Sequence, residues 1–224
     1  MPILFVFLQF ETESTRHART RGGTNGIIEL LKEYPKHSTS AEECCWTLLQ
    51  MASKSDDAND FRERLIEKEF ITPIIVKSFQ RALKKLHWGA MKQSLGLLWY
   101  LAKDQSSTYM KQLCTFKLIE FSTEAIKFVT RALKKLKLAE KTSALASCFC
   151  DIAELASNLI SCIVTEKDGR GVFKGIRVKD VFENMKNELE GVPSPEYILD
   201  SFERCVNVAA RKKPVKKKSH SKRK

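Results

Sequence analysis

The sequence lacks several features that would assign it to a specialised class of protein. It has no run of about 18 apolar residues, so we expect no membrane span. It has no Cys-x-x-Cys pair, and its seven cysteines and four histidines do not have the spacing of metal ligands. We therefore expect no metal site, a reducing intracellular compartment, and thiols that serve as small apolar residues.

Signatures of catalysis are also missing. The chain contains no H-E-x-x-H, G-x-S-x-G or Walker pattern. The stretch DGRGVFKG at 168–175 has three glycines, but their spacing fits neither a dinucleotide-binding loop nor a phosphate-binding loop. We interpret it as a flexible turn. The expectation is a non-catalytic protein without a cofactor and without a small-molecule substrate.

Acidic residues are absent from the last 14 residues, RKKPVKKKSHSKRK. Of the net charge of +12, only +3 belongs to the rest of the chain, which has 30 basic and 27 acidic residues. The composition predicts a disordered tail over 211–224. Three functions stay open for it: a nuclear localisation signal, a non-specific contact with nucleic-acid phosphates, or a solubilising tail. The residues concerned are Arg211, Lys212, Lys213, Lys216, Lys217, Lys218, Lys222, Arg223 and Lys224.

The opening decamer, MPILFVFLQF, has a short apolar core but no positively charged start and no small-residue cleavage site. These absences argue against a signal peptide. Three interpretations of the decamer stay open: a strand-like cap, a helical cap, or the edge of a truncated chain. No structure is assigned to the N-terminal segment 1–21 as a whole.

What the sequence does contain is an internal repeat. The hexamer RALKKL occurs at 81–86 and again at 131–136. Around both copies, apolar residues recur every three or four positions, as on one face of a helix. The pattern predicts helices at 25–35, 39–52, 60–69, 71–86, 89–103, 107–116, 117–136 and 139–164. Thr72 is expected to cap the helix at 71–86, and Ser40 with Glu43 to form a capping box.

The repeated unit is therefore a short helix followed by two longer helices, with a period of about fifty residues. Each unit has an apolar face that it can bury only against a neighbouring unit. We predict an all-α fold, an α-α superhelix of about three repeats spanning 22–164. Three units are close to the minimum for a stable array, so a longer parent protein stays an open interpretation.

Two stretches resemble the armadillo-repeat family. ANDFRERLIEKEFITPIIVKSFQRAL at 58–83 is similar to the first helix, turn and second helix of such a repeat, and CCWTLLQMA at 44–52 is similar to a third helix. The family's usual glycine between the first two helices is replaced by Glu69-Phe70 and by Phe116-Lys117, so a HEAT-like or irregular array stays open. The resemblance implies that third helices line a concave groove that binds a partner protein or peptide.

Candidate partner-binding residues lie on the third helices, opposite the buried stripe. Trp46 and Gln50 resemble the W-x-x-x-N pair of importin-type repeats, with Gln in place of Asn. The pair does not recur in the later helices, so we do not expect binding of nuclear signals. Packing of Trp46 against a neighbouring helix is the alternative to partner contact. The full set of candidates is Trp46, Gln50, Trp99, Tyr100, Lys103, Asp151 and Asn158.

Two further amphipathic helices are expected at 177–191 and 194–213. We predict that the segment 165–210 caps the array, because an exposed stacking face needs a cover. A separate helical hairpin that binds a partner is the second interpretation.

Two functions from different classes follow. The first is a scaffold or adaptor in the nucleus or cytoplasm that binds a partner segment along the concave face. The alternative is a nucleic-acid-associated protein whose basic tail contacts phosphates. The two differ in salt dependence, because binding through the tail falls steeply as salt rises.

Overall fold

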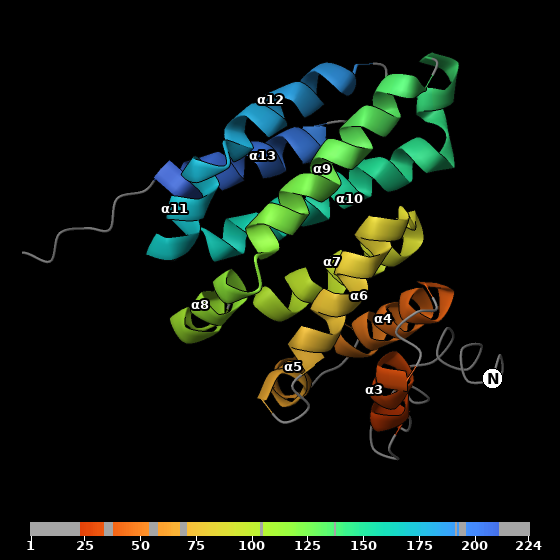
Figure 1. The fold of residues 1–224 in the computed structure, drawn as a ribbon, viewed down its shortest axis with the longest axis vertical. Coiled ribbons are helices and arrows are strands. Elements are labelled where there is room, and N and C mark those ends of the chain that lie inside the picture. The colour runs from red at the N-terminus through yellow and green to blue at the C-terminus, as the bar shows by residue number, and fades with distance from the viewer. Residues whose placement is uncertain are drawn as a thin grey trace, which may run out of the picture.

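The computed structural model describes residues 23–33, 38–53, 58–67, 71–103, 105–136, 138–190, 192 and 196–210. Within these ranges the chain forms α-helices and one 3-10 helix, with no strand (Figure 1). The prediction of an all-α fold is confirmed. The N-terminal segment 1–21 and the basic tail 211–224 lie outside the described residues, so the predictions made for them stay predictions.

The helices follow one another with short connections. In chain order they are α3 (Gly23–Glu33), α4 (Ser38–Ser53), α5 (Ala58–Glu67), α6 (Ile71–Lys85), α7 (Trp88–Ala102), α8 (Ser107–Thr115), α9 (Leu118–Lys135), the 3-10 helix η1 (Leu138–Thr142), α10 (Ala144–Ile163), α11 (Lys167–Gly175), α12 (Val178–Glu188) and α13 (Glu196–Ala210).

Most predicted helices agree with the structure to within a few residues at their ends, because the three-and-four spacing of apolar residues marks the buried face directly. The predicted helix at 139–164 is divided. Residues Leu138–Thr142 form η1, and α10 starts after Ser143. The Ser143 hydroxyl accepts a hydrogen bond from the Ala146 amide at 3.3 Å and so caps α10.

Two predicted helix caps are wrong, because Thr72 and Ser40 both lie inside their helices rather than before the first turn. Thr72 lies inside α6, where its hydroxyl group is buried 2.7 Å from the hydroxyl of Tyr109 on α8. Ser40 lies inside α4, which starts at Ser38. A helix start depends on what the preceding residue packs against, and a capping motif in the sequence does not include that information.

The stretch at 168–175 is not a flexible turn, and that prediction is also wrong. It forms most of α11, and Phe173 is buried in the core. A Cβ atom at Gly169 would clash with the carbonyl oxygen of Ile163, at the end of α10. The glycine therefore permits a close approach between two helices, rather than supplying flexibility.

The helices pack in two connected rows (Figure 1). We call α3, α6, α9 and α12 the second helices, and each of them contacts the next along the chain. We call α4, α7, α10 and α13 the third helices, and these also contact one another in order. Each second helix further contacts the third helix of its own unit, as α9 contacts α10.

The segment predicted as a cap repeats the helix order of the unit before it. The helices α8 and α11 are both nine residues long, and each is followed by a two-residue connection to the next helix. The second connecting residue has a positive φ in both units, 55° at Lys117 and 53° at Arg177. Two sequences with little similarity thus form the same left-handed turn.

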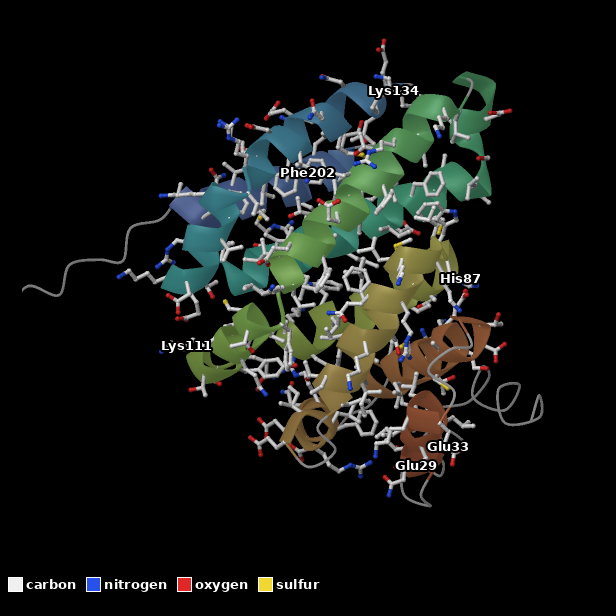
Figure 2. The ribbon with its side chains drawn as sticks, viewed as in Figure 1. Glu29, Glu33, His87, Lys111, Lys134 and Phe202 are labelled. Carbon is white, nitrogen blue, oxygen red and sulfur yellow. The ribbon has the colours of Figure 1, made fainter. Side chains whose placement is uncertain are left out.

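The central helix α10 contacts α7, α8, α9 and α13. Among the described residues it is the one helix long and apolar enough to cross a membrane by length and composition, and 67% of its most apolar window is buried inside the protein. Its apolar residues are thus largely used within the fold. At the C-terminal end, Phe202 (Figure 2) lies on α13. Its ring stacks on that of Phe182 at 4.3 Å and joins α12 to α13.

Candidate functional site: the surface of the third helices

The partner-binding residues predicted from the sequence lie on or next to the third helices. We call the surface of these helices that includes Glu42, Trp46, Lys92, Asp151 and Glu154 the third-helix face. All five side chains are partly exposed. They come from α4, α7 and α10, so the face extends over at least three consecutive units.

Glu42 connects α4 to the start of α7. Its carboxylate lies where a Cβ atom at Gly89 would be, so the missing side chain makes room for it in the first turn of α7. A carboxylate is favoured there, because the helix dipole is positive at that end. His87 precedes this turn (Figure 2), and its Nδ1 lies 3.6 Å from Glu42 Oε2. The same nitrogen accepts a hydrogen bond from the Ala90 amide at 3.2 Å, so it has no proton to donate to Glu42.

Lys92 connects α7 to α10. Its Nζ lies 2.6 Å from Asp151 Oδ2, and the two side chains are 37% and 30% exposed. The half-buried Cys148 lies within electrostatic reach of both charges. Burial raises the pKa of its thiol, and Lys92 opposes that increase. The pair joins two neighbouring units through side chains that a binding partner can still reach.

A polar cluster connects α10 to α13. Partial burial and the nearby charge of Asp151 raise the pKa of Glu154, while a hydrogen bond with Asn158 and the charge of Arg204 act in the opposite direction. Burial raises the pKa of Tyr197 on α13 to about 12, with the neighbouring acidic side chains adding to the effect. The side chains at this end therefore lie close enough to influence one another's ionisation.

In the middle of the third-helix face, apolar side chains from two neighbouring helices lie over α7. A Cβ atom at Gly96 would lie 3.2 Å from Leu49 Cδ2 and 3.8 Å from Leu155 Cδ1. Leu49 comes from α4 and Leu155 from α10, so the helices on both sides of α7 place a side chain over this glycine. The absence of a side chain at Gly96 lets the three helices pack closely at this point.

Charge on the third helices is mainly negative. Within their bounds they carry two basic residues, Lys92 and Arg204, and seven acidic residues, Glu42, Glu43, Asp151, Glu154, Glu196, Asp200 and Glu203. On the third-helix face itself, Glu42, Asp151 and Glu154 outnumber Lys92. An excess of acidic groups favours a ligand with positive charge.

Two of the predicted partner-binding residues have contacts within the protein instead. The Tyr100 hydroxyl donates a hydrogen bond to the carbonyl of Ala52 at the end of α4, and its ring lies under the guanidinium of Arg62 at 5.7 Å. Arg62 Nη1 also donates to the carbonyl of Lys103 at 2.8 Å. Tyr100 and the backbone of Lys103 thus hold α5 against α7, while the Lys103 side chain is exposed.

The other five candidates divide by exposure. Trp46, Trp99 and Gln50 are half-buried, and both Trp99 and Gln50 have contacts within the protein. Asp151 is on the face but is paired with Lys92. Asn158 is only 5% exposed, so it lies beneath the face rather than on it. The structure leaves Trp46 as the large aromatic side chain of α4 that is partly open to solvent.

Sequence reasoning missed Glu42, Lys92 and Gly89, and it missed that Gly96 allows close packing. Gly89 and Gly96 lie seven residues apart, about two turns of a helix, and therefore share one face. That spacing in a predicted helix could have indicated a close approach by its neighbours. The contacts of Glu42 and Lys92 could not be predicted from spacing in the sequence, because each joins two different helices.

The cysteines show no sign of activated thiol chemistry. All seven are free. Burial raises the pKa of Cys44 to about 11 and that of Cys45 to about 12, so both thiols are protonated at neutral pH. Among the described residues, no three His, Cys, Asp or Glu side chains are grouped so that they could hold a metal ion.

Comparison with protein-family models, with curated proteins and with solved structures gives no match for this chain.

Proposed function

We propose that the protein is an armadillo-like helical-repeat adaptor, and that its third helices line a concave face that binds an extended, positively charged segment of a partner protein. The observation that carries the proposal is the packing of α4, α7, α10 and α13 in chain order, with Trp46 partly open and acidic side chains in excess. A row of equivalent helices offers equivalent positions to an extended ligand.

The connection between the first and second helices supports the resemblance to armadillo repeats. The family usually has a glycine there. Lys117 and Arg177 occupy this connection here, and both have the positive φ that glycine adopts most easily. At Phe116-Lys117 the conformation is thus present although the residue differs, which supports the resemblance there, whereas Glu69-Phe70 lies outside the described residues.

Affinity capture from cell lysate with the full-length protein and with Trp46→Ala tests the proposal. Lys111→Ala, an exposed position on α8, is the matched control. We expect one protein partner to be captured by the wild type and the control and to be lost with Trp46→Ala, because aromatic anchors contribute strongly to binding. Cross-links from the partner should map to α4, α7 and α10.

Thermal unfolding distinguishes this result from damage to the fold. The unfolding midpoint of Trp46→Ala should stay within a few degrees of that of the wild type. A partner that is captured equally by all three proteins, or is lost together with a large drop in the midpoint, would show that Trp46 packs within the protein and does not contact a partner.

A further inference from the structure

The repeated hexamer places basic side chains on two adjacent second helices. Lys77, Arg81 and Lys84 are spaced four and three residues apart on α6, so they lie on one side of that helix. Lys127, Arg131 and Lys134 have the same spacing on α9. The helices α6 and α9 contact each other. We call these six residues the basic stripes, and Figure 2 shows Lys134 near the C-terminal end of α9.

The stripes point away from the core. The buried residues of α6 and α9 occupy the opposite side of each helix, and Lys77, Lys84, Arg131 and Lys134 are exposed. Charges of the helix dipole favour lysines in the last turn only. Lys77 and Lys127 lie two turns or more from the C-terminal ends of their helices, so the dipole does not account for them.

Few acidic groups oppose the stripes. The helix α6 contains no acidic residue, and in the described part of the chain no carboxylate lies within 4.0 Å of Lys77 or Lys84. On α9, Lys127 pairs with Glu124 at 2.6 Å, whereas Lys134 is 75% exposed and reaches Glu188 only at 4.0 Å.

Surface hollows flank both stripes. One of about 480 Å³ lies between α9 and α12. The stripe of α9 lines it together with Asn184, Asn187 and one carboxylate, that of Glu188. Another of about 190 Å³ lies between α3 and α6, where Lys32 and Ser78 join Lys77 and Arg81. Amide, hydroxyl, ammonium and guanidinium groups are the donors that phosphate oxygens accept from.

We propose that the basic stripes bind the phosphate backbone of a nucleic acid, which goes beyond protein binding by the third-helix face. Protein interfaces are poor in lysine and rich in exposed aromatic side chains, and this surface has the opposite composition. Insertion into a membrane needs an apolar face, and the exposed large apolar side chains of the described residues are only Leu86 and Leu145. Among the described residues of α6 and α9, the aromatic side chain beside the stripes, Phe128, is only partly exposed and lies under Arg131 at 5.2 Å. Contact with phosphates rather than with bases is therefore expected.

Binding of a single-stranded RNA of about 20 nucleotides to the full-length protein tests the proposal. The stripe variant is K77Q/K84Q/R131Q/K134Q. The matched control is K111Q/K167Q/K174Q/K179Q, which removes the same charge from exposed lysines on α8, α11 and α12. Both variants keep the tail, so its contribution to binding is equal.

At about 0.1 M salt we expect the stripe variant to bind at least about tenfold more weakly than the control. The slope of log K against log salt should become less steep by nearly 3, because each lost phosphate contact on a single strand contributes about 0.7. The melting curves of both variants should match that of the wild type.

If both variants lost affinity equally, total charge rather than the stripes would determine binding, and the proposal would be wrong. It would also be wrong if the wild type did not bind RNA at low salt. Polyglutamate of matched length that competes as strongly as the RNA would reassign the stripes to an acidic protein segment. None of these results depends on Trp46, so the proposal can fail without affecting the proposed function.

Discussion

The second helices α6 and α9 differ from the third helices in how they use charge. Together α6 and α9 carry eight basic and two acidic residues, and several of the lysines extend freely into solvent. The third helices carry two basic and seven acidic residues, and one basic and one acidic residue pair across a helix boundary, where Lys92 meets Asp151. Charged side chains on α6 and α9 therefore mainly face solvent, whereas on the third helices a charged pair also connects one unit to the next.

The two rows also differ in packing. On the third helices, Gly89 and Gly96 let side chains from neighbouring helices cross α7. The outward side of α6 has no such close approach, because long lysine side chains extend from it into solvent. A substitution on the third helices should thus change stability, while one on the basic stripes should mainly change electrostatics.

The largest expected effect comes from Gly96→Leu. The new side chain competes with Leu49 and Leu155 for space over α7, and overpacking costs about 1–3 kcal/mol, which exceeds the gain in helix propensity of about 0.8 kcal/mol. We expect a clearly lower midpoint in thermal or urea unfolding. Lys84→Leu, on the exposed side of α6, is the control and should change stability by less than about 0.5 kcal/mol. Equal midpoints for the two variants would contradict the difference in packing.

A smaller effect is expected for the ion pairs. Double-mutant cycles on Lys92 with Asp151, and on Lys127 with Glu124, compare a pair between helices with a pair within one helix. We expect a coupling energy of about 0.5–1 kcal/mol for the first, which is the less exposed, and about 0.2–0.5 kcal/mol for the second. Urea unfolding of the single and double variants measures both. A larger coupling energy for the pair within α9 would contradict the view that charges on the third helices connect one unit to the next.

The smallest effect concerns the pH dependence of stability. The pKa of Glu154 is raised in the folded protein, so its protonated form favours folding at low pH, and this contribution is lost as pH rises through the folded pKa. Glu154→Gln should therefore be slightly more stable than the wild type at pH 7 and equal to it below the ordinary carboxyl pKa. Thermal unfolding at several pH values measures this difference. A variant that is less stable at pH 7 would show that Asn158 and Arg204 dominate instead.

Several parts of the structure could be predicted from the sequence. The spacing of the apolar residues predicted the positions of most helices. The second copy of the hexamer RALKKL indicated a repeating unit. The failures were local. Glycines at 168–175 suggested a turn, but two of the three face open space and the third, Gly169, fits against the end of α10. Glycine content alone does not distinguish flexibility from close packing.

The candidate site was less predictable than the fold. The face of α4 that carries Trp46 followed from helical geometry, since one helix fixes which residues share a side. Asn158 was placed on the surface by the same argument and is buried, because contacts with neighbouring helices leave less of α10 exposed than one apolar stripe suggests.

By itself, the sequence determined the helices, their repeated order and the basic stripes, because spacing along one helix decides which side chains align. Only the tertiary structure decided that Glu42 lies over Gly89, that Lys92 meets Asp151, and that Tyr100 and Lys103 secure α5 through Arg62. Those contacts depend on the relative rotation and offset of neighbouring helices, and these are set by how whole side-chain surfaces fit together.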